Sequence, residues 1–280
     1  MGNQIKTVFL LGLLTALFLW VGNLVGGPSG LTIAIFFALI MNFGSYWFSD
    51  KIVLKMYKAK EVKESDEPEL YKLVKEIINT AKIPMPKIYI MNALYANAFA
   101  TGRNPKHSAV AVTKGIIDLL SKEELKGVIA HEISHIKNRD TLIQAVAATI
   151  AGVISYVAFM ARWVAIFGGR DDDSSGLEFL VLAILTPILA AIIQMAISRS
   201  REFIADSSAA KLLHSGEGLA TALEKLENST KHISLRKNSQ TQVTAHLFIT
   251  NPFRGGNLLK LFSTHPQTKE RIRRLKNMNF

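Results

Sequence analysis

Four long apolar segments divide the chain. The first two cover residues 7–25 and 31–48 and are separated by the turn sequence GGPSG at 26–30. The third and fourth cover residues 145–167 and 177–197. Each is close to the roughly 20 residues that an α-helix needs to cross a bilayer. The pattern therefore predicts four hydrophobic helices, arranged as two hairpins in a membrane.

Two alternatives remain open for these segments. Lys6 and later small residues flank the first segment as in a cleaved signal peptide, but the segment is longer than the apolar core of such peptides. A second apolar segment also follows almost at once. The third and fourth segments are compatible with a buried helical hairpin that does not cross the membrane, although their lengths favour spanning.

The distribution of charge predicts the orientation of the hairpins. Lys6 precedes the first segment, and four lysines follow the second, at positions 51, 55, 58 and 60. The loop at 168–175 carries three aspartates and one arginine. Because lysine and arginine are enriched on the cytoplasmic side of membrane proteins, both termini and the polar parts of the chain are expected in the cytoplasm.

The polar segments predict an α+β domain in two parts. Before the third apolar segment, residue alternation and helical spacing predict a helix over 68–81, strands over 87–92, 96–101 and 108–113, a short helix over 115–120, and a helix from residue 121 that the third apolar segment continues. After Arg201, the pattern predicts helices over 202–213, 217–226 and 267–276, and an irregular stretch at 229–257 with a short strand at 243–249.

The expected domain organisation follows from these segments. An N-terminal hairpin occupies residues 1–50, and a second hairpin occupies residues 141–198. Between and after them lie the two parts of the polar domain, residues 51–140 and 199–280. The chain is thus predicted to be a mainly α membrane protein with a small β-sheet in its polar domain.

Composition narrows the classes of function. The 280 residues carry 33 Lys and Arg against 22 Asp and Glu, which gives a formal charge of +11. The basic residues are scattered, without the basic and aromatic platform of a nucleic-acid binder, so no nucleic-acid partner is expected. The chain has no cysteine, which excludes disulfides and cysteine-ligated metal sites. Any metal must therefore be held by His, Asp or Glu.

The sequence HEISH at residues 131–135 is the main candidate for chemistry. Residues four apart point the same way on an α-helix, so His131 and His135 can bind one zinc ion. Glu132 can then reach the water on that zinc and act as general base. A capping box at Ser121 and Glu124 predicts the start of the helix. The alternative is an accidental match, because the pentapeptide fixes only three positions.

A catalytic zinc site usually has three protein ligands and one water. Glu202 is the candidate for the third, because a helix that returns from the second hairpin would bring it back to the level of His135. Asp206, one turn later, suits an acceptor for the N–H of a ligand imidazole. The alternatives are a charge at a helix end for Glu202 and a solvated helix face for Asp206.

Several motifs together resemble a known family. HEISH, followed by SRSREFIADSSAA at 198–210 and STHP at 263–266, is similar to the membrane-bound zinc metalloproteases of the HtpX type, relatives of the CAAX prenyl endopeptidase among the gluzincins. The resemblance covers nearly the whole chain. It implies a cytoplasmic zincin-like (gluzincin) domain in which His131, His135 and Glu202 bind one Zn2+ per subunit and Glu132 is the catalytic base.

The resemblance assigns roles to two weaker signals. The stretch Asn97, Ala98, Phe99 and Ala100 matches the edge strand of the family's active site, which would bind an extended substrate by strand addition. His265 matches the downstream histidine, a donor to the oxyanion of the tetrahedral intermediate. From the residues alone, an ordinary strand and a capping or surface histidine remain open. Arg271, six residues later, is expected to anchor its segment.

The resemblance also implies a biological role. It points to cleavage of misfolded or membrane proteins at the cytoplasmic face of the bacterial inner membrane, in quality control under stress, with the lipid bilayer and other membrane proteases as partners. Two other functions remain open. One is a prenyl-protein processing peptidase with the same chemistry, and the other is a non-catalytic membrane scaffold or transporter.

Overall fold

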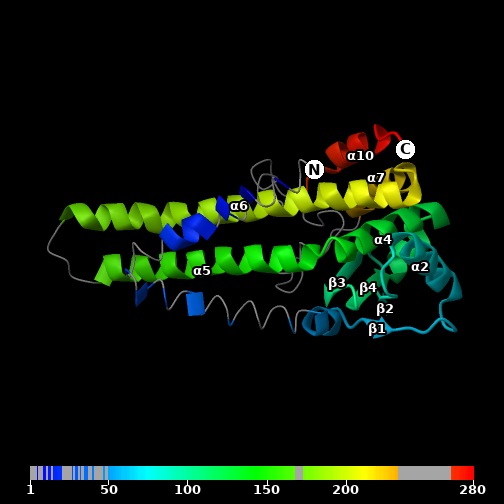
Figure 1. The fold of residues 1–280 in the computed structure, drawn as a ribbon, viewed down its shortest axis with the longest axis horizontal. Helices are drawn as coiled ribbons and strands as arrows, with labels where there is room; N and C mark the ends of the chain where they lie inside the picture. Colours follow the sequence, from blue (N-terminus) through cyan, green and yellow to red (C-terminus); the bar gives the residue numbers. More distant parts are fainter. Residues whose placement is uncertain are drawn as a thin grey trace. The chain divides into compact units, whose positions relative to one another are not determined.

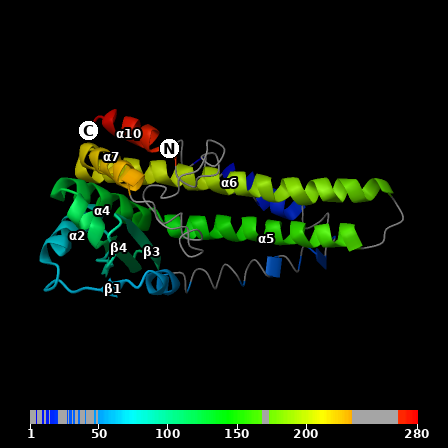
Figure 2. The ribbon, with the colours of Figure 1, turned by 180° about the vertical axis from the view of Figure 1, so that it is seen from behind.

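The computed structural model of the chain describes residues 50–167, 173–232 and 266–280, together with residues 5, 9, 10, 12, 13, 15–20, 27, 29, 30, 32, 35, 36, 40 and 47. The chain divides into two compact units. The apolar unit combines Met1–Tyr46 with Ile143–Ser200, and the polar unit combines Trp47–Leu142 with Arg201–Phe280. Figures 1 and 2 show the elements of both units from opposite sides.

The apolar unit contains most of two long helices, α5 (Asp140–Phe167) and α6 (Asp173–Leu213), which run side by side in both views (Figures 1 and 2). Small residues and isoleucines of both helices form its buried cluster, joined by Phe18. Large apolar side chains on the outer side of α6 are exposed, for example Ile184 and Leu185. A helix with this pattern suits a lipid environment.

One helical segment among the described residues, Ala183–Leu213, is long and apolar enough to cross a membrane. A shorter apolar helical segment covers Asp140–Tyr156. Much of the first hairpin lies outside the described residues. The four spans therefore stay a prediction.

The polar unit contains a four-stranded mixed sheet in the order β1-β2-β4-β3. Its strands are β1 (Lys60–Glu61), β2 (Lys87–Met91), β3 (Ala98–Asn104) and β4 (His107–Thr113). β2 and β4 are parallel, whereas β1 and β3 pair antiparallel with their neighbours. The three predicted strands are confirmed, and β1 was missed because two residues carry no alternation signal. The order of the strands leaves β3 at an edge of the sheet.

Helices of the polar unit stack in layers on one face of this sheet, so that only some of them touch the strands. They are α2 (Pro68–Ala81), α3 (Lys114–Leu119), α4 (Lys122–Lys137), α7 (Glu217–His232) and α10 (Thr268–Lys276), and their apolar residues form one core with the inward side chains of β2, β3 and β4. The predicted bounds of α2 are confirmed. Pro68 stands at its first turn, and Lys82 ends it in the left-handed conformation with an N–H bond to the carbonyl of Ile78.

Three helix bounds differ from the prediction. The helix with the HEISH motif does not continue into the third apolar segment: α4 ends at Lys137, Arg139 has a φ of 56°, and α5 begins at Asp140. α6 runs unbroken to Leu213 instead of restarting near residue 202, because the basic and acidic residues there are good helix formers. α7 extends to His232, into a stretch predicted to be irregular.

The close approach of α4 and α7 depends on Gly127, and its replacement by alanine should destabilise the protein. A Cβ atom there would lie 2.6 Å from the backbone N of Leu219, and backbone cannot rotate away. We expect Gly127→Ala to cost about 1–3 kcal/mol, seen as a lower melting temperature. Gly152→Ala on α5 is the matched control, since its Cβ would meet nothing within 4 Å. Equal melting temperatures for both variants would contradict the packing described.

Candidate metal centre

The α4 helix places both histidines of the HEISH motif. The predicted capping box is present: Ser121 Oγ accepts a bond from the N–H of Glu124, and Glu124 Oε2 accepts one from the N–H of Ser121. Since the helix is regular, His131 and His135 lie one turn apart on one side. Their rings meet edge to face, with centroids 4.6 Å apart, and their Nε2 atoms are separated by 3.1 Å.

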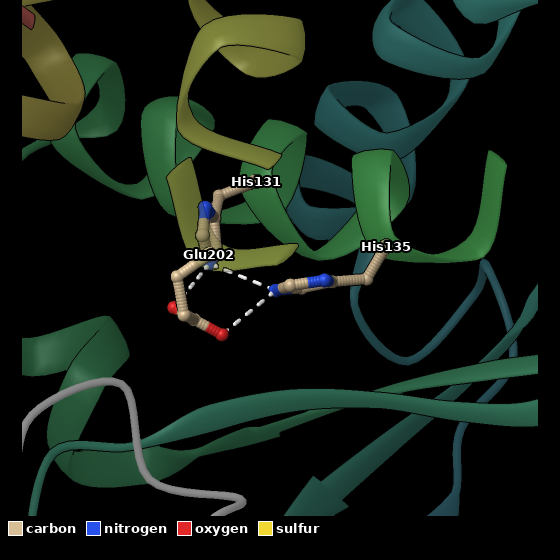
Figure 3. A group of neighbouring side chains, drawn as sticks. All are labelled: His131, His135 and Glu202. Carbon is tan, nitrogen blue, oxygen red and sulfur yellow. Dashed lines mark hydrogen bonds and ion pairs between the residues drawn. The ribbon is translucent and has the colours of Figure 1, made fainter. Parts of the chain in front are cut away.

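Glu202 of α6 joins the two imidazoles (Figure 3). Its Oε2 lies 3.6 Å from Nε2 of His131, and its Oε1 lies 3.4 Å from Nε2 of His135. A tetrahedral ion with bonds of about 2.0–2.1 Å holds its ligand atoms about 3.3–3.4 Å apart. The three ligand-atom separations bracket this value. The buried cluster of His131, His135 and Glu202 therefore fits a metal ion.

Asp206 supports His131, as its place one turn beyond Glu202 predicts. Its Oδ1 lies 3.0 Å from Nδ1 of His131, the ring nitrogen that does not face Glu202. Both side chains are almost completely buried. An imidazole that binds a metal through Nε2 carries its proton on Nδ1, and a carboxylate there fixes that tautomer. The position of Asp206 suits this role.

Arg271 of α10, near the C-terminus, contacts the carboxylates of the metal cluster and its support. Its Nε and Nη2 donate to the two carboxylate oxygens of Asp206, at 2.8 and 2.7 Å, and its Nη1 lies 3.4 Å from Glu202 Oε2. Burial lowers the pKa of the guanidinium, but the carboxylates outweigh burial and raise it overall. The sequence predicted only an anchor here. The one sequence signal was an arginine on the apolar side of a basic helix.

His135 has a carboxylate of its own that the sequence did not predict. Asp140 Oδ2 lies 2.7 Å from Nδ1 of His135, and Asp140 Oδ1 accepts a bond from Nε of Arg201 at 2.5 Å. Asp140 is the first residue of α5, after the break that ends α4. Each histidine of the cluster is thus held by an aspartate, and each aspartate by an arginine.

Glu132 lies between the metal cluster and the edge strand. Its side chain is 5% exposed, and its Oε2 accepts a 2.7 Å bond from the backbone N–H of Ala100 on β3. Burial raises the pKa of Glu132 above its ordinary value of 4.5, and the two histidines and the Ala100 N–H oppose that rise. A carboxylate with a raised pKa is suited to both accept and return a proton near neutral pH.

The predicted substrate-binding residues lie at or next to the edge strand, but they differ in orientation. Asn97 is buried and bonds to Thr113 of β4 through both backbone groups. The side chain of Phe99 packs on the other face of the sheet, 5.5 Å from the ring of Tyr57, so it does not face the metal cluster. His265, the predicted oxyanion donor, lies outside the described residues.

Metal binding to this cluster should weaken as the pH falls. Burial lowers the pKa of His135, but Asp140 and Glu202 outweigh burial and raise it well above 6.5. Burial also lowers the pKa of His131, but Asp206 and Glu202 outweigh burial and raise it. A metal needs the neutral imidazole, so it must displace protons that both rings hold below their raised pKa values. Zinc affinity should rise by about tenfold per pH unit for each displaced proton.

Calorimetry in two buffers of different ionisation enthalpy measures this proton release directly. The expected result is a buffer-dependent heat of zinc binding near neutral pH. A zinc affinity that stays constant between about pH 6 and 8 would show that the imidazoles are already neutral.

The fold and the cluster together define a class, the metallopeptidases with an HExxH helix and a distant glutamate. Comparison with known proteins supports this class. The family model of peptidase family M48 matches residues 64–279. The chain belongs to peptidase family M48.

Two bacterial relatives match over all or nearly all of their length. A protein named "Protease HtpX homolog" from Syntrophobacter fumaroxidans is 50% identical, over 99% of this chain and 100% of the relative. A protein of the same name from Persephonella marina is 54% identical, over 99% of this chain and 97% of the relative. The chain is therefore a membrane metalloprotease, and the scaffold alternative is wrong.

A solved structure shares the fold. The crystal structure of S. mikatae Ste24p superposes with a TM-score of 0.60 at 19% identity, over 98% of this chain. The chain spans 65% of the length of that protein. This likeness confirms a mostly helical, Ste24-like membrane metalloprotease fold with a small mixed sheet, and it concerns the fold alone.

Proposed function

We propose that this protein is a zinc-dependent endopeptidase in which His131, His135 and Glu202 bind one zinc ion and Glu132 is the general base. One observation carries the proposal. A glutamate 67 residues beyond the HEISH motif meets both imidazoles at separations of 3.4 to 3.6 Å, which suit a tetrahedral ion.

The donor set favours zinc over other divalent ions. Two imidazoles and one carboxylate are a frequent ligand set of catalytic zinc, whereas calcium and magnesium prefer oxygen ligands alone. Three protein ligands also leave a fourth position for a water molecule or a substrate oxygen. When bound, zinc would polarise the scissile carbonyl and lower the pKa of the attacking water.

Glu132 would move the proton that hydrolysis requires. The N–H of Ala100 holds Oε2 of Glu132, so its other oxygen, Oε1, is available to the attacking water. Glu132 would take a proton from the water as its oxygen bonds to the carbonyl carbon. It would then give that proton to the amine nitrogen as the C–N bond breaks. His265 as a donor to the oxyanion remains a prediction.

The place of β3 at the edge of the described sheet supports an extended peptide as substrate. Asn97 bonds to β4, so alternation turns the backbone groups of Ala98 and Ala100 toward the open edge. Two groups on that edge are already engaged: the N–H of Ala100 with Glu132, and the carbonyl of Gly102 with the hydroxyl of Thr141. Strand addition is therefore expected mainly over 97–100. Backbone pairing is tolerant of sequence, which suits unfolded segments.

The cellular setting is part of the proposal. Exposed lysines after the first hairpin support a cytoplasmic active site, with both termini on the same side of a bacterial inner membrane. Membrane proteins and unfolded polypeptides are the expected substrates, in quality control under stress. Other membrane proteases remain candidate partners.

Removal and return of the metal test the proposal. Detergent-purified protein should contain one zinc per chain and cleave casein, and 1,10-phenanthroline should reduce cleavage to background. Added zinc should restore activity, whereas magnesium, the control ion, should not. Activity that survives complete removal of zinc would contradict the proposal. Cleavage confined to prenylated peptides would favour the prenyl-processing alternative.

A further inference from the structure

The contact between His135 and Asp140 depends on the break between α4 and α5. On an unbroken helix, five residues correspond to about 500°, so Asp140 would point roughly 140° away from His135. The chain instead turns at Arg139, whose φ is 56°, and α5 starts again at Asp140. A non-glycine residue in this conformation is uncommon and costs free energy. The turn brings the Asp140 carboxylate back to the ring of His135.

Asp140 is almost inaccessible to solvent and is held on both of its oxygens. Its side chain is 1% exposed, with Oδ2 at 2.7 Å from His135 Nδ1 and Oδ1 at 2.5 Å from Arg201 Nε. Arg201 is itself buried, and its Nη2 contacts Asp140 and lies 3.4 Å from the carbonyl oxygen of Asn138, at the end of α4. One guanidinium therefore joins α6 to both sides of the break.

The charges explain why this arrangement is stable. A buried carboxylate is costly unless it is paired and hydrogen-bonded, and Arg201 supplies both. With its other oxygen fixed by Arg201, Asp140 offers a stationary acceptor to Nδ1 of His135. The ring then carries its proton on Nδ1 and directs the lone pair of Nε2 toward His131 and Glu202.

The helix α6 supplies both a candidate zinc ligand and the arginine that holds Asp140. Arg201 and Glu202 are neighbours on α6, so the helix that presents the Glu202 carboxylate to the cluster also holds the partner of His135. The arrangement parallels Asp206 and Arg271 on His131: α6 supplies the arginine of the first pair and the aspartate of the second. The presence of an aspartate–arginine pair behind each of the two histidines favours a role at the metal centre.

We propose that Asp140 and Arg201 are positioning residues of the metal centre: Asp140 fixes the tautomer and orientation of His135, and Arg201 fixes Asp140. The inference rests on the proposed zinc site. It adds that the turn at Arg139 and the arginine before Glu202 are parts of that site, although neither touches the ion.

A purely structural ion pair is the competing explanation, and a double variant separates the two. Arg201→Leu alone leaves the buried Asp140 carboxylate without its cation, and Asp140→Ala alone leaves the buried Arg201 guanidinium without its anion, so both should lower the melting temperature. Asp140→Ala/Arg201→Leu removes both charges and should regain most of the lost stability. His135 still lacks its acceptor in this double variant. Its zinc affinity should stay 10- to 100-fold below wild type.

The experiment measures zinc affinity by competition with a chromogenic chelator, and the visible spectrum after substitution with Co2+. Thr141→Val is the matched control, because Thr141 is the next residue but bonds to the carbonyl of Gly102 instead of His135. The control should bind zinc as wild type does. The double variant should show the weaker affinity and a changed Co2+ spectrum, since the ring of His135 is no longer fixed.

Two results would overturn the inference, in different ways. Zinc affinity and a Co2+ spectrum equal to wild type in the double variant would show that the pair is only structural, while the zinc site itself stands. A wild-type protein that binds neither ion would overturn the proposed zinc site and this inference with it.

Discussion

Replacement of Glu132 by glutamine should lower casein hydrolysis by roughly 100- to 10,000-fold, the usual contribution of a general acid–base group. Glutamine keeps the shape and can still accept the 2.7 Å bond from the N–H of Ala100, but it cannot take a proton from water. The zinc content should stay at one per chain, because Glu132 is not among the residues that converge as ligands.

The matched control for this variant is Glu123→Gln, an exposed glutamate on the same helix. It removes an equal charge from α4 and should leave both zinc content and hydrolysis unchanged. Appreciable hydrolysis by the Glu132→Gln protein, with zinc bound, would assign the proton transfer to another group.

Replacement of Glu202 by alanine should have the largest effect on metal binding. Glu202 supplies the only oxygen in the described cluster, and Arg271 and the two histidines would lose their shared negative partner. We expect zinc affinity to fall by more than the roughly 10- to 100-fold typical for loss of an outer partner. Hydrolysis should be lost together with the metal.

A graded series distinguishes the ligand from its support. Asp206→Asn should weaken zinc binding by roughly 10- to 100-fold, because Asp206 contacts His131 and not the ion. Exposed Glu217, on α7, can be changed to glutamine as a surface control. If Asp206→Asn weakened binding more than Glu202→Ala, the assignment of Glu202 as the third ligand would be wrong.

Local signals explain what the sequence could predict. The capping box at Ser121 and the apolar stripe of α4 depend on residues within a few turns of one another, so the orientation of His131 and His135 followed from spacing. Alternation likewise identified β2, β3 and β4. Glu202 needed a further assumption, that a helix returns to the motif, and the structure places it beside both imidazoles.

The partners of the histidines show where sequence prediction ends. Asp140 lies five residues from His135, a spacing that a continuous helix would turn away, and only the break at Arg139 makes the contact. The pattern of apolar residues does not predict the break between α4 and α5. Arg271 reaches the centre because α10 packs against α7, a contact between distant segments that no local pattern contains.

Strand order and the position of the edge are also properties of the folded chain. Alternation gives strands but not their neighbours, so the edge position of β3 came from the family resemblance, and the order β1-β2-β4-β3 of the described strands agrees with it. The substrate-binding role of β3 stays a prediction. Alternation also did not indicate that Phe99 faces away from α4. The strand expected at 243–249 and His265 lie outside the described residues and stay predictions.

X-ray absorption at the zinc edge, on detergent-purified protein, tests the central claim most directly. We expect one zinc per chain with about four nitrogen and oxygen neighbours at roughly 2.0–2.2 Å, two of them imidazoles, in wild type and in Glu132→Gln alike. In Glu202→Ala this signal should be lost. A six-oxygen shell without imidazole scattering, or protein free of zinc, would contradict a centre built from His131, His135 and Glu202.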